Sequence, residues 1–266
     1  MINIGINGVC GRMGLRIAGL VAKDENLKLV TALEMEGHPD MGEDLSSSVI
    51  GQVHDGVKIS HEFSGSPDVL IDFTTPASTM ARLKYCVDNG VAAVIGTTGL
   101  DSEQKEEINK ASEKIPCLFS PNMSIGVNLL FNLAETVSKI LGDESDIEII
   151  ESHHRLKKDA PSGTALKLAE KICSATNREM DDVVIYGRKG LTGERPKDQI
   201  CIHSIRSGDI VGEHTITFCS GGERLELVHK AQTRDSFAIG AIRAAKFLSG
   251  KPPGFYNMED ALRDKC

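Results

Sequence analysis

The chain of 266 residues has few aromatic side chains, no tryptophan and no excess of positive charge. Phe, Trp and Tyr together make up 4% of the residues, and the formal net charge is -8. Proteins that bind nucleic acids usually carry a basic surface for phosphates or aromatic side chains that stack on bases. This composition favours neither surface, so we expect no nucleic-acid partner.

Long hydrophobic runs are also missing. The apolar runs are far shorter than the roughly 20 residues that a helix needs to span a bilayer. The first residues, MINIGINGVCGRMG, have neither the basic start nor the extended apolar stretch of a secretory signal peptide. We therefore expect a cytoplasmic protein without a membrane partner.

The seven cysteines include no CxxC pair and no other spacing typical of metal ligands. An odd number of cysteines without paired spacing favours free thiols in a reducing compartment. His153 and His154 have no carboxylate partner at helical spacing, which is the pattern that would suggest zinc. The sequence therefore predicts no metal site.

The first half of the chain does contain a regular alternation of predicted strands and helices. The predicted strands are residues 1–6, 28–33, 57–60, 69–73, 91–95 and 116–120, and the predicted helices are 12–23, 78–89 and 102–112. Because these strands are continuous apolar runs, we expect helices to cover both faces of a parallel sheet.

The second half has a different pattern. Predicted helices at 127–141, 161–173 and 236–248 accompany predicted strands at 147–151, 183–186, 200–206, 213–219 and 223–231. Residues 187–198 are rich in Gly, Lys and Arg and are typical of a loop. The sequence thus predicts an α/β protein, with a Rossmann-type parallel-sheet domain followed by an α+β domain with a mixed sheet. The residues alone do not assign the last helix to either domain.

Three glycines, Gly8, Gly11 and Gly14, follow the first predicted strand and open a predicted helix. Gly8 would permit a tight turn, Gly11 a close approach of backbone to a pyrophosphate, and Gly14 close packing of helix on strand. The first helical turn would offer unpaired N–H groups, and Arg12 would add a charge. We predict that this loop binds a dinucleotide through Gly8, Val9, Cys10, Gly11, Arg12 and Met13.

Glu34 ends the second predicted strand, where a carboxylate that binds the cofactor ribose is expected. Its charge favours a free ribose hydroxyl over a 2′-phosphate, and the neighbouring Met35 brings no positive charge. The sequence therefore predicts that NADH serves at least as well as NADPH. The alternative is an ordinary strand–helix turn with a surface glutamate.

Two further loops follow predicted strands at the same edge of the sheet. Ligands of open parallel sheets bind beyond the carboxyl ends of the strands. The predicted cofactor contacts in these loops are Gly96, Thr97 and Thr98, and then Ser120, Pro121, Asn122 and Met123. The alternative for each loop is that its residues only form a turn.

Five basic or potentially basic side chains lie within six residues, from His153 to Lys158, directly before a predicted helix start. A helix N-terminus beside such side chains is suited to anions. We predict that a small dicarboxylate binds the Gly163 and Thr164 amides. Lys157 would donate a proton to a carbanion or enamine formed after hydride addition. The alternative is a solvated basic turn that only caps the helix.

Residues 148–165 resemble the signature of dihydrodipicolinate reductases, E-[I/V]-x-E-x-H-x-x-x-K-x-D-x-P-S-G-T-A, and match each of its fixed positions. The resemblance extends over nearly the whole chain and includes Glu34, Asn122 and residues 8–14, 96–98 and 192–195. Members of that family reduce 4-hydroxy-tetrahydrodipicolinate to tetrahydrodipicolinate with NADH or NADPH. The reaction loses water and belongs to the diaminopimelate route to lysine.

The resemblance also implies roles for individual residues. His153 and Lys157 would be the catalytic pair, with Lys157 as the proton donor. His154 and the amides of Gly163 and Thr164 would hold the substrate carboxylates. Whether His153 acts as a general acid or stabilises the bound dicarboxylate electrostatically stays open.

The family architecture implies two domains. Residues 1–124, completed by 235–266, would bind the dinucleotide. Residues 125–234 would bind substrate and form a homotetramer, with hinges near 123–126 and 233–236. Met35 departs from the family, because many relatives that use both cofactors carry Arg there. Cys10 is a second peculiarity: a helix N-terminus lowers a thiol pKa, so we predict a reactive thiol whose oxidation blocks cofactor binding.

Two other functions compete with this interpretation. An aspartate- or homoserine-type dehydrogenase on the same scaffold would need other catalytic motifs in the second domain, and none is found. A non-enzymatic dinucleotide sensor would keep the glycine loop, but it would have no need for His153 and Lys157 beside a helix start.

Overall fold

The computed structural model describes residues 1–45 and 56–264, so Cys266 lies outside the described residues. The chain divides into two compact units. Unit 1 comprises Met1–Ile125 and the segment from Asp235 onward, and unit 2 comprises Gly126–Arg234. The segment from Asp235 onward, including the predicted last helix, thus belongs to the same unit as the N-terminal residues.

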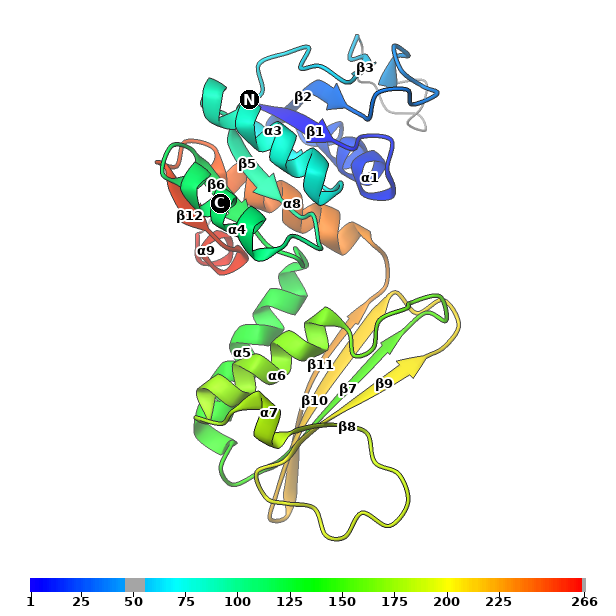
Figure 1. Cartoon of the computed structure of the whole chain (residues 1–266), viewed down its shortest axis with the longest axis vertical. Helices are drawn as coiled ribbons and strands as arrows, with labels where there is room; N and C mark the ends of the chain where they lie inside the picture. Colours follow the sequence, from blue (N-terminus) through cyan, green and yellow to red (C-terminus); the bar gives the residue numbers. More distant parts are fainter. Residues whose placement is uncertain (46–55, 265–266) are drawn as a thin grey trace. The chain divides into compact units, whose positions relative to one another are not determined.

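Unit 1 is built on a seven-stranded sheet with the order β12-β6-β5-β4-β1-β2-β3 (Figure 1). Its strands are β1 (Ile2–Asn7), β2 (Leu27–Leu33), β3 (Ile59–Ser60), β4 (Val69–Asp72), β5 (Ala92–Ile95), β6 (Pro116–Phe119) and β12 (Gly254–Tyr256). Its helices are α1 (Arg12–Val21), α3 (Pro76–Asn89), α4 (Ser102–Ser112), α8 (Asp235–Leu248) and α9 (Met258–Arg263). The strand pairings are all parallel, as expected for a Rossmann-type sheet.

Helices cover both faces of this sheet because apolar residues of its strands point to either side. Val69 and Ile71 of β4 enter the core layer that contains α1 and α8, whereas Leu70 enters the layer that contains α3 and α4. The order of strands reverses at β1, which lies between β2 and β4. Ligands of such sheets bind at this reversal, beyond the carboxyl ends of the strands, and Gly8 follows β1 at this position.

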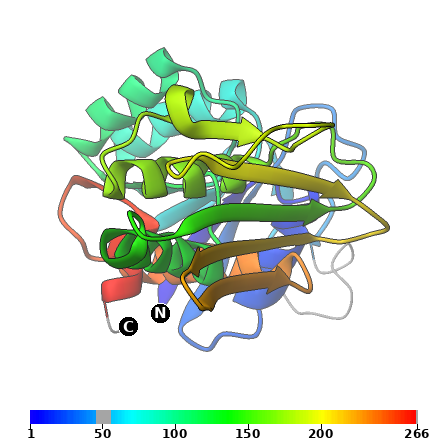
Figure 2. The same cartoon turned by 90° about the horizontal axis from the view of Figure 1, so that it is seen from below.

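Unit 2 contains a five-stranded sheet with the order β11-β10-β7-β9-β8 (Figure 2). Its elements are α5 (Ile125–Leu141), β7 (Asp146–His153), α6 (Gly163–Ala175), α7 (Met180–Val183), β8 (Val184–Tyr186), β9 (Ile200–Arg206), β10 (Gly212–Ser220) and β11 (Glu223–Ala231). β10 runs antiparallel to β7 and β11, whereas β9 runs parallel to β7 and β8. The predicted mixed sheet is therefore confirmed.

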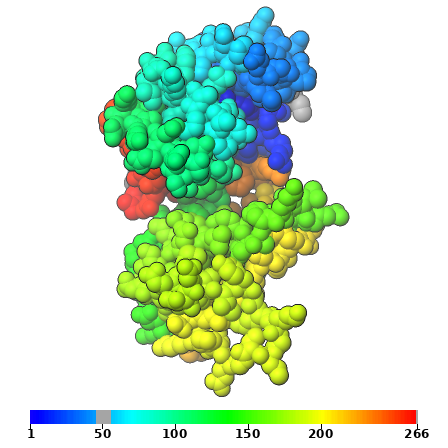
Figure 3. All heavy atoms as spheres, in the orientation of Figure 1, coloured from blue at the N-terminus to red at the C-terminus, as the bar shows by residue number. Residues whose placement is uncertain are grey.

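One face of the unit 2 sheet packs against α5 and α6. Leu130 and Ala134 of α5 join Leu168 of α6 in a core with Ile149 and Phe218 of the sheet. Residues 187–199, between β8 and β9, contain neither helix nor strand and project from unit 2 (Figures 1 and 3).

Most predicted elements are observed within a few residues of their expected bounds. α6 begins two residues later than predicted, because the Ser162 hydroxyl accepts the Ala165 N–H and caps the helix. Pro161 consequently lies before the helix. The short elements α7, β12 and α9 were not predicted, since so few residues show no periodicity. In the described part of the chain, no helix combines the length and the hydropathy that a membrane span requires.

Candidate active site

The loop after β1 has the conformation that its glycines were predicted to allow. Gly8 has a φ of 77°, and a Cβ there would lie 2.6 Å from the Thr74 Cγ2 atom. A Cβ on Gly14 would lie 2.1 Å from the Gly8 carbonyl oxygen, so any larger residue would push α1 away from the loop. A Cβ on Gly11 would meet only the Gly8 oxygen, at 3.1 Å.

The N-terminus of α1 is suited to an anion. Gly11 is its N-cap, so no side chain caps the first turn, and that turn carries no acidic residue. Unpaired N–H groups and the positive end of the helix dipole therefore meet at the loop. Arg12 is exposed beside them. These features fit the pyrophosphate of a dinucleotide.

Glu34 follows β2 and contacts the same loop. Its carboxylate accepts the Cys10 N–H at 3.0 Å and the Met35 N–H at 2.9 Å. Burial, followed by the charges of Glu34 and Asp40, raises the pKa of the Cys10 thiol to about 11. The prediction of a low pKa at Cys10 is wrong, because burial, together with the two carboxylates, outweighs the helix N-terminus.

Several predicted cofactor residues can contribute only their backbone. Val9 is fully buried, and the Met123 side chain lies in the same core cluster. Thr97 is also buried, and its hydroxyl donates a hydrogen bond to Asp72 at 3.1 Å. Thr98 is exposed. The Thr97 hydroxyl is thus used inside the protein, so a cofactor contact at this residue would involve its backbone.

Asp72 at the end of β4 ties together three strand ends, a role that the sequence did not indicate. Asn7 Nδ2 donates to its carboxylate at 2.9 Å, and the Thr74 hydroxyl donates at 2.6 Å. Asp72 is 2% exposed, and burial raises its pKa although these hydrogen bonds and that of Thr97 oppose the shift. The network fixes the loops on which a dinucleotide would rest.

In unit 2, a second buried carboxylate organises the signature residues. Glu151 of β7 is fully buried and accepts two hydrogen bonds from Arg206, both of 2.8 Å. It also accepts the Ser162 N–H at 3.1 Å and contacts His153 Nδ1 at 2.6 Å. Burial opposes ionisation of Glu151, but the hydrogen bonds from Arg206 and His153 outweigh it and lower its pKa to about 2.

This contact determines the tautomer of His153. Because the Glu151 carboxylate is ionised, Nδ1 of His153 carries the proton and Nε2 keeps its lone pair. Burial lowers the pKa of His153, an effect that its hydrogen bond to Glu151 opposes. A Cβ on Gly212 would lie 3.1 Å from His153 Nε2, so this glycine leaves room for the ring.

The N-terminus of α6 is tied to the same network through a second histidine. Ser162 Oγ lies 3.0 Å from His214 Nε2. Burial and then the nearby His153 lower the pKa of His214 to about 3, so that this ring is neutral. Gly163 is exposed, and a Cβ there would meet no atom within 4 Å. The helix start is therefore accessible to a ligand.

Lys157 is joined to the Glu151 network through the turn that it occupies. Its Nζ lies 2.8 Å from both carboxylate oxygens of Asp159, and Arg206 donates to the Asp159 carbonyl at 2.6 Å. The Nδ1 atom of His154 is buried and has no hydrogen-bond partner within the described residues. His153, His154, Lys157 and Gly163 thus all lie on elements connected to Glu151.

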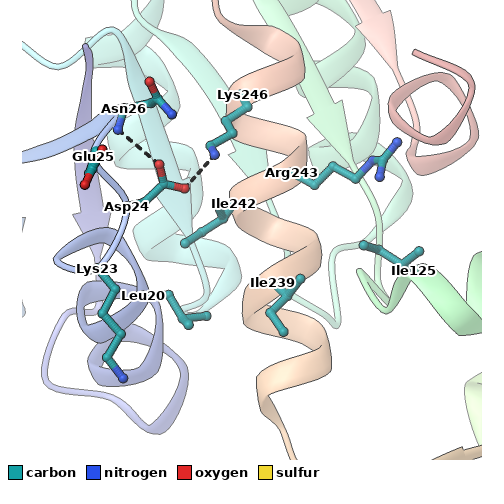
Figure 4. A pocket seen from close by; sticks show the side chains of 10 residues that line it. All are labelled: Leu20, Lys23, Asp24, Glu25, Asn26, Ile125, Ile239, Ile242, Arg243 and Lys246. Carbon is teal, nitrogen blue, oxygen red and sulfur yellow. Dashed lines mark hydrogen bonds and ion pairs between the residues drawn. The ribbon is translucent and has the colours of Figure 1, made fainter. Parts of the chain in front are cut away.

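A separate hollow of about 590 Å³ lies in unit 1, between the end of α1 and α8 (Figure 4). Its charged groups are already used: Lys246 pairs with Asp24 at 2.5 Å, and Arg243 donates to the Ala261 carbonyl at 3.0 Å. None of the predicted site residues lines it. We therefore assign it no part in the chemistry.

Comparisons with known proteins assign both halves of the chain to one family. Residues 2–123 match the model of the dihydrodipicolinate reductase N-terminus, and residues 126–262 match that of the C-terminus. A 4-hydroxy-tetrahydrodipicolinate reductase from Syntrophobacter fumaroxidans is 46% identical and covers 98% of this chain and 99% of its own. One from Anaeromyxobacter sp. is 47% identical, with 98% of each chain covered.

Solved structures give the same result. A dipicolinate-bound dihydrodipicolinate reductase from Paenisporosarcina sp. TG-14 is 29% identical, with a TM-score of 0.77 and 98% of each chain covered. An amine dehydrogenase from Mycobacterium smegmatis, 12% identical with a TM-score of 0.59, shares the fold alone. With both halves matched by the family models, this chain belongs to the dihydrodipicolinate reductase family.

Proposed function

We propose that this chain reduces 4-hydroxy-tetrahydrodipicolinate to tetrahydrodipicolinate, with loss of water, in the diaminopimelate route to lysine. The observation that carries the proposal is the Glu151 network, which joins His153, Arg206 and the start of α6 in one connected site. A dinucleotide sensor would have no use for this arrangement. Relatives of nearly equal length carry this activity in their names.

The substrate is a small dicarboxylate, and the start of α6 suits one of its carboxylates. The exposed N-terminus of a 13-residue helix presents N–H groups, and Gly163 leaves the approach clear. Thr164 follows in the first turn, and His154 would add a further donor. The dipicolinate bound by the Paenisporosarcina relative is a compound of the same class.

Lys157 is the proposed proton donor, and His153 has a different role. The lowered pKa of His153 leaves its ring neutral near pH 7, with Nδ1–H directed at Glu151. A neutral ring with a free Nε2 accepts hydrogen bonds and orients the substrate, but it does not supply a proton. The Lys157 ammonium is held by Asp159 and carries protons that it can donate to the reduced substrate.

The proposed cofactor is NADH or NADPH, which supplies the hydride when bound. The Gly8–Gly14 loop would bind its pyrophosphate and Glu34 its ribose, with Gly96, Thr98 and residues 120–123 beneath the nicotinamide. Met35 is 69% exposed and carries no charge, and Glu34 would repel a 2′-phosphate. We therefore propose that NADH serves at least as well as NADPH. Parallel steady-state assays with each cofactor test this, and a strong preference for NADPH would contradict it.

We further propose that unit 1 binds the dinucleotide and that unit 2 binds substrate and forms a homotetramer. The sheet face of unit 2 that lies away from α5 and α6 exposes apolar side chains, including Ile150, Ile205 and Val228, and further copies of this chain would cover it. Light scattering of the wild type and of Val228→Glu would measure the assembly. Cysteines without paired spacing favour a cytoplasmic location.

Replacement of Lys157 by Ala tests the reaction itself. We expect kcat to fall by roughly 10²- to 10⁴-fold, the usual contribution of a positioned proton donor. The dissociation constant for NADH, measured by fluorescence titration, should stay within about twofold, since Lys157 is not in unit 1. Lys158→Ala, on the exposed neighbour, serves as the matched control. A variant that loses only NADH affinity would contradict this role for Lys157.

A further inference from the structure

Three potential metal ligands meet in unit 1 beside the glycine loop. The Cys10 thiol, a ring nitrogen of His38 and a carboxylate oxygen of Asp40 all lie within 4.8 Å of one another. Cys10 follows β1, whereas His38 and Asp40 lie in the segment after β2. Their spacing in the sequence is irregular, so no pattern in the sequence indicated that they lie together. Thiolate, imidazole and carboxylate together are ligands of zinc-type divalent cations.

The charges around these ligands favour a cation. Glu34 accepts the Cys10 N–H, and a carboxylate oxygen of Asp40 lies within 4.8 Å of the Cys10 thiol, so two carboxylates lie beside the sulfur. His38 Nδ1 lies 3.9 Å from the Asp40 carboxylate, but this nitrogen accepts the Asp40 N–H and so offers no proton to the carboxylate. Within residues 1–45 and 56–264, no Lys or Arg forms a salt bridge with Asp40 or Glu34. A divalent cation would therefore neutralise charge that the protein leaves uncompensated.

A similar cluster in unit 2 differs in the positive charge that surrounds its carboxylate. Glu148, Cys201 and His203 also bring three potential ligand atoms within 4.8 Å of one another. There, however, Arg188 donates two hydrogen bonds to the Glu148 carboxylate, at 2.8 and 3.0 Å, and Arg195 donates a third at 3.1 Å. The arginines already neutralise that carboxylate and would repel a metal ion. The two clusters share ligand types but differ in charge.

We propose that Cys10, His38 and Asp40 bind a zinc-type divalent cation, and that the bound ion excludes the nicotinamide cofactor. On binding, the Cys10 S–H bond breaks, a sulfur–metal bond forms and the proton passes to solvent, with no change of oxidation state. If the ion binds His38 at Nδ1, it replaces the Asp40 N–H, which donates there at 3.2 Å. Water completes the coordination.

The exclusion of cofactor rests on the proposed function, because it requires that Glu34 and the Cys10 loop bind the dinucleotide. An ion on the Cys10 sulfur lies next to the Glu34 carboxylate and attracts it. The ribose hydroxyls would then compete with the metal for this carboxylate. Free zinc would act as an inhibitor that competes with NADH.

Cobalt(II) titration of the metal-free full-length protein tests the metal site by itself. We expect one cobalt per chain and a near-ultraviolet charge-transfer band, which reports a thiolate–cobalt bond. The band should vanish in Cys10→Ser. Loss of a residue that only hydrogen-bonds a metal ligand usually lowers metal affinity by roughly 10- to 100-fold. Because His38 would bind the metal directly, the cobalt affinity of His38→Ala should fall by more than that. Cys201→Ser, from the other cluster, should bind cobalt as the wild type does. A band that persists in Cys10→Ser overturns the proposal.

NADH titration with and without zinc tests the exclusion. In the wild type, the apparent dissociation constant for NADH should rise in proportion to free zinc, whereas His38→Ala should show no such rise. If NADH binds normally at saturating zinc, the exclusion is overturned and the proposed function is unaffected. If cobalt binds through Cys10 but NADH binds neither with nor without metal, the cofactor assignment fails and the metal site is supported.

Discussion

Each unit contains a buried carboxylate near the end of a central strand, and the two differ in their hydrogen-bond partners and in the direction of their pKa shifts. Asp72 in unit 1 is 2% exposed and is held by neutral donors, the Asn7 amide and the hydroxyls of Thr74 and Thr97. Glu151 in unit 2 is fully buried and is held by Arg206 together with His153. The pKa of Asp72 is raised, whereas that of Glu151 is lowered to about 2.

The difference shows that the partners of a buried carboxylate, more than its depth, decide the direction in which its pKa shifts. Burial opposes ionisation of both groups, but only a nearby cation compensates for the lost water. Neutral hydroxyls and amides are sufficient where the carboxyl only joins loops, as at Asp72. A full negative charge is required where the carboxylate must hold the Nδ1 proton of a histidine, as Glu151 does.

The largest effect is expected from removal of the cation beside Glu151. Arg206→Met would leave a buried carboxylate without compensation, at a cost of about 3–5 kcal/mol in the free energy of unfolding. Urea denaturation followed by circular dichroism measures this. Arg188→Met, which breaks a half-exposed pair with Glu148, should cost much less, because Arg195 remains. Equal losses for the two variants would contradict the importance of burial.

Replacement of the carboxylate itself should impair catalysis more than folding. Glu151→Gln keeps the shape but lets an N–H group face His153 Nδ1, so the ring would adopt the other tautomer. We expect kcat to fall by roughly 10²-fold or more while NADH affinity is unchanged. Glu148→Gln, on the other face of β7, is the control. Wild-type kcat in Glu151→Gln would show that the tautomer of His153 is unimportant.

The stability of unit 2 should decrease on acidification, because the lowered pKa values of His214 and Glu151 act in the same direction. Between pH 6.5 and about 3, His214 binds a proton in the unfolded state but not in the native state. The free energy of unfolding therefore falls as the pH falls, by up to about 1.4 kcal/mol per pH unit. Glu151 adds to this between pH 4.5 and about 2.

Urea denaturation at several pH values from 7 to 5 measures how the free energy of unfolding changes with pH, to which His214 contributes. His214→Gln should make the slope shallower, whereas a change at the exposed His61 should leave it as it is. An unchanged slope in His214→Gln would mean that the native state takes up this proton.

The smallest effect is expected at Asp72. In Asp72→Asn the Thr74 and Thr97 hydroxyls can rotate to accept the new amide N–H groups, so the cost should stay below about 1.5 kcal/mol. The raised pKa of Asp72 means that stability is lost as the pH rises through the native value, opposite in sign to Glu151. The variant should lack this dependence. If Asp72→Asn lost as much free energy of unfolding as Arg206→Met, the proposed difference between the two carboxylates would be wrong.

Local features of the chain were predictable because short-range sterics and periodicity control them. The bounds of α4, β9 and β11 agree with prediction to the residue. Gly8 has a positive φ, and a side chain at Gly14 would collide with the loop itself. The contiguous signature at 148–165 likewise identified the family without any structure.

The pairing of distant residues was not predictable. Glu151 meets Arg206 across 55 positions, and Asn7 meets Asp72 across 65. The prediction of a low thiol pKa at Cys10 was wrong for the same reason, since the fold buries the thiol and also brings Glu34 beside it. Hydrophobic periodicity does not predict contacts between residues so far apart in the sequence.

The sequence by itself determined the order of strands and helices, the glycine loop and the family, because each depends on neighbouring residues or on one short motif. Only the tertiary structure decided in which direction the pKa of a titratable group shifts. The pKa values of Asp72, Glu151, Cys10 and His214 depend on burial and on partners from other strands, and both exist only after the sheets have formed.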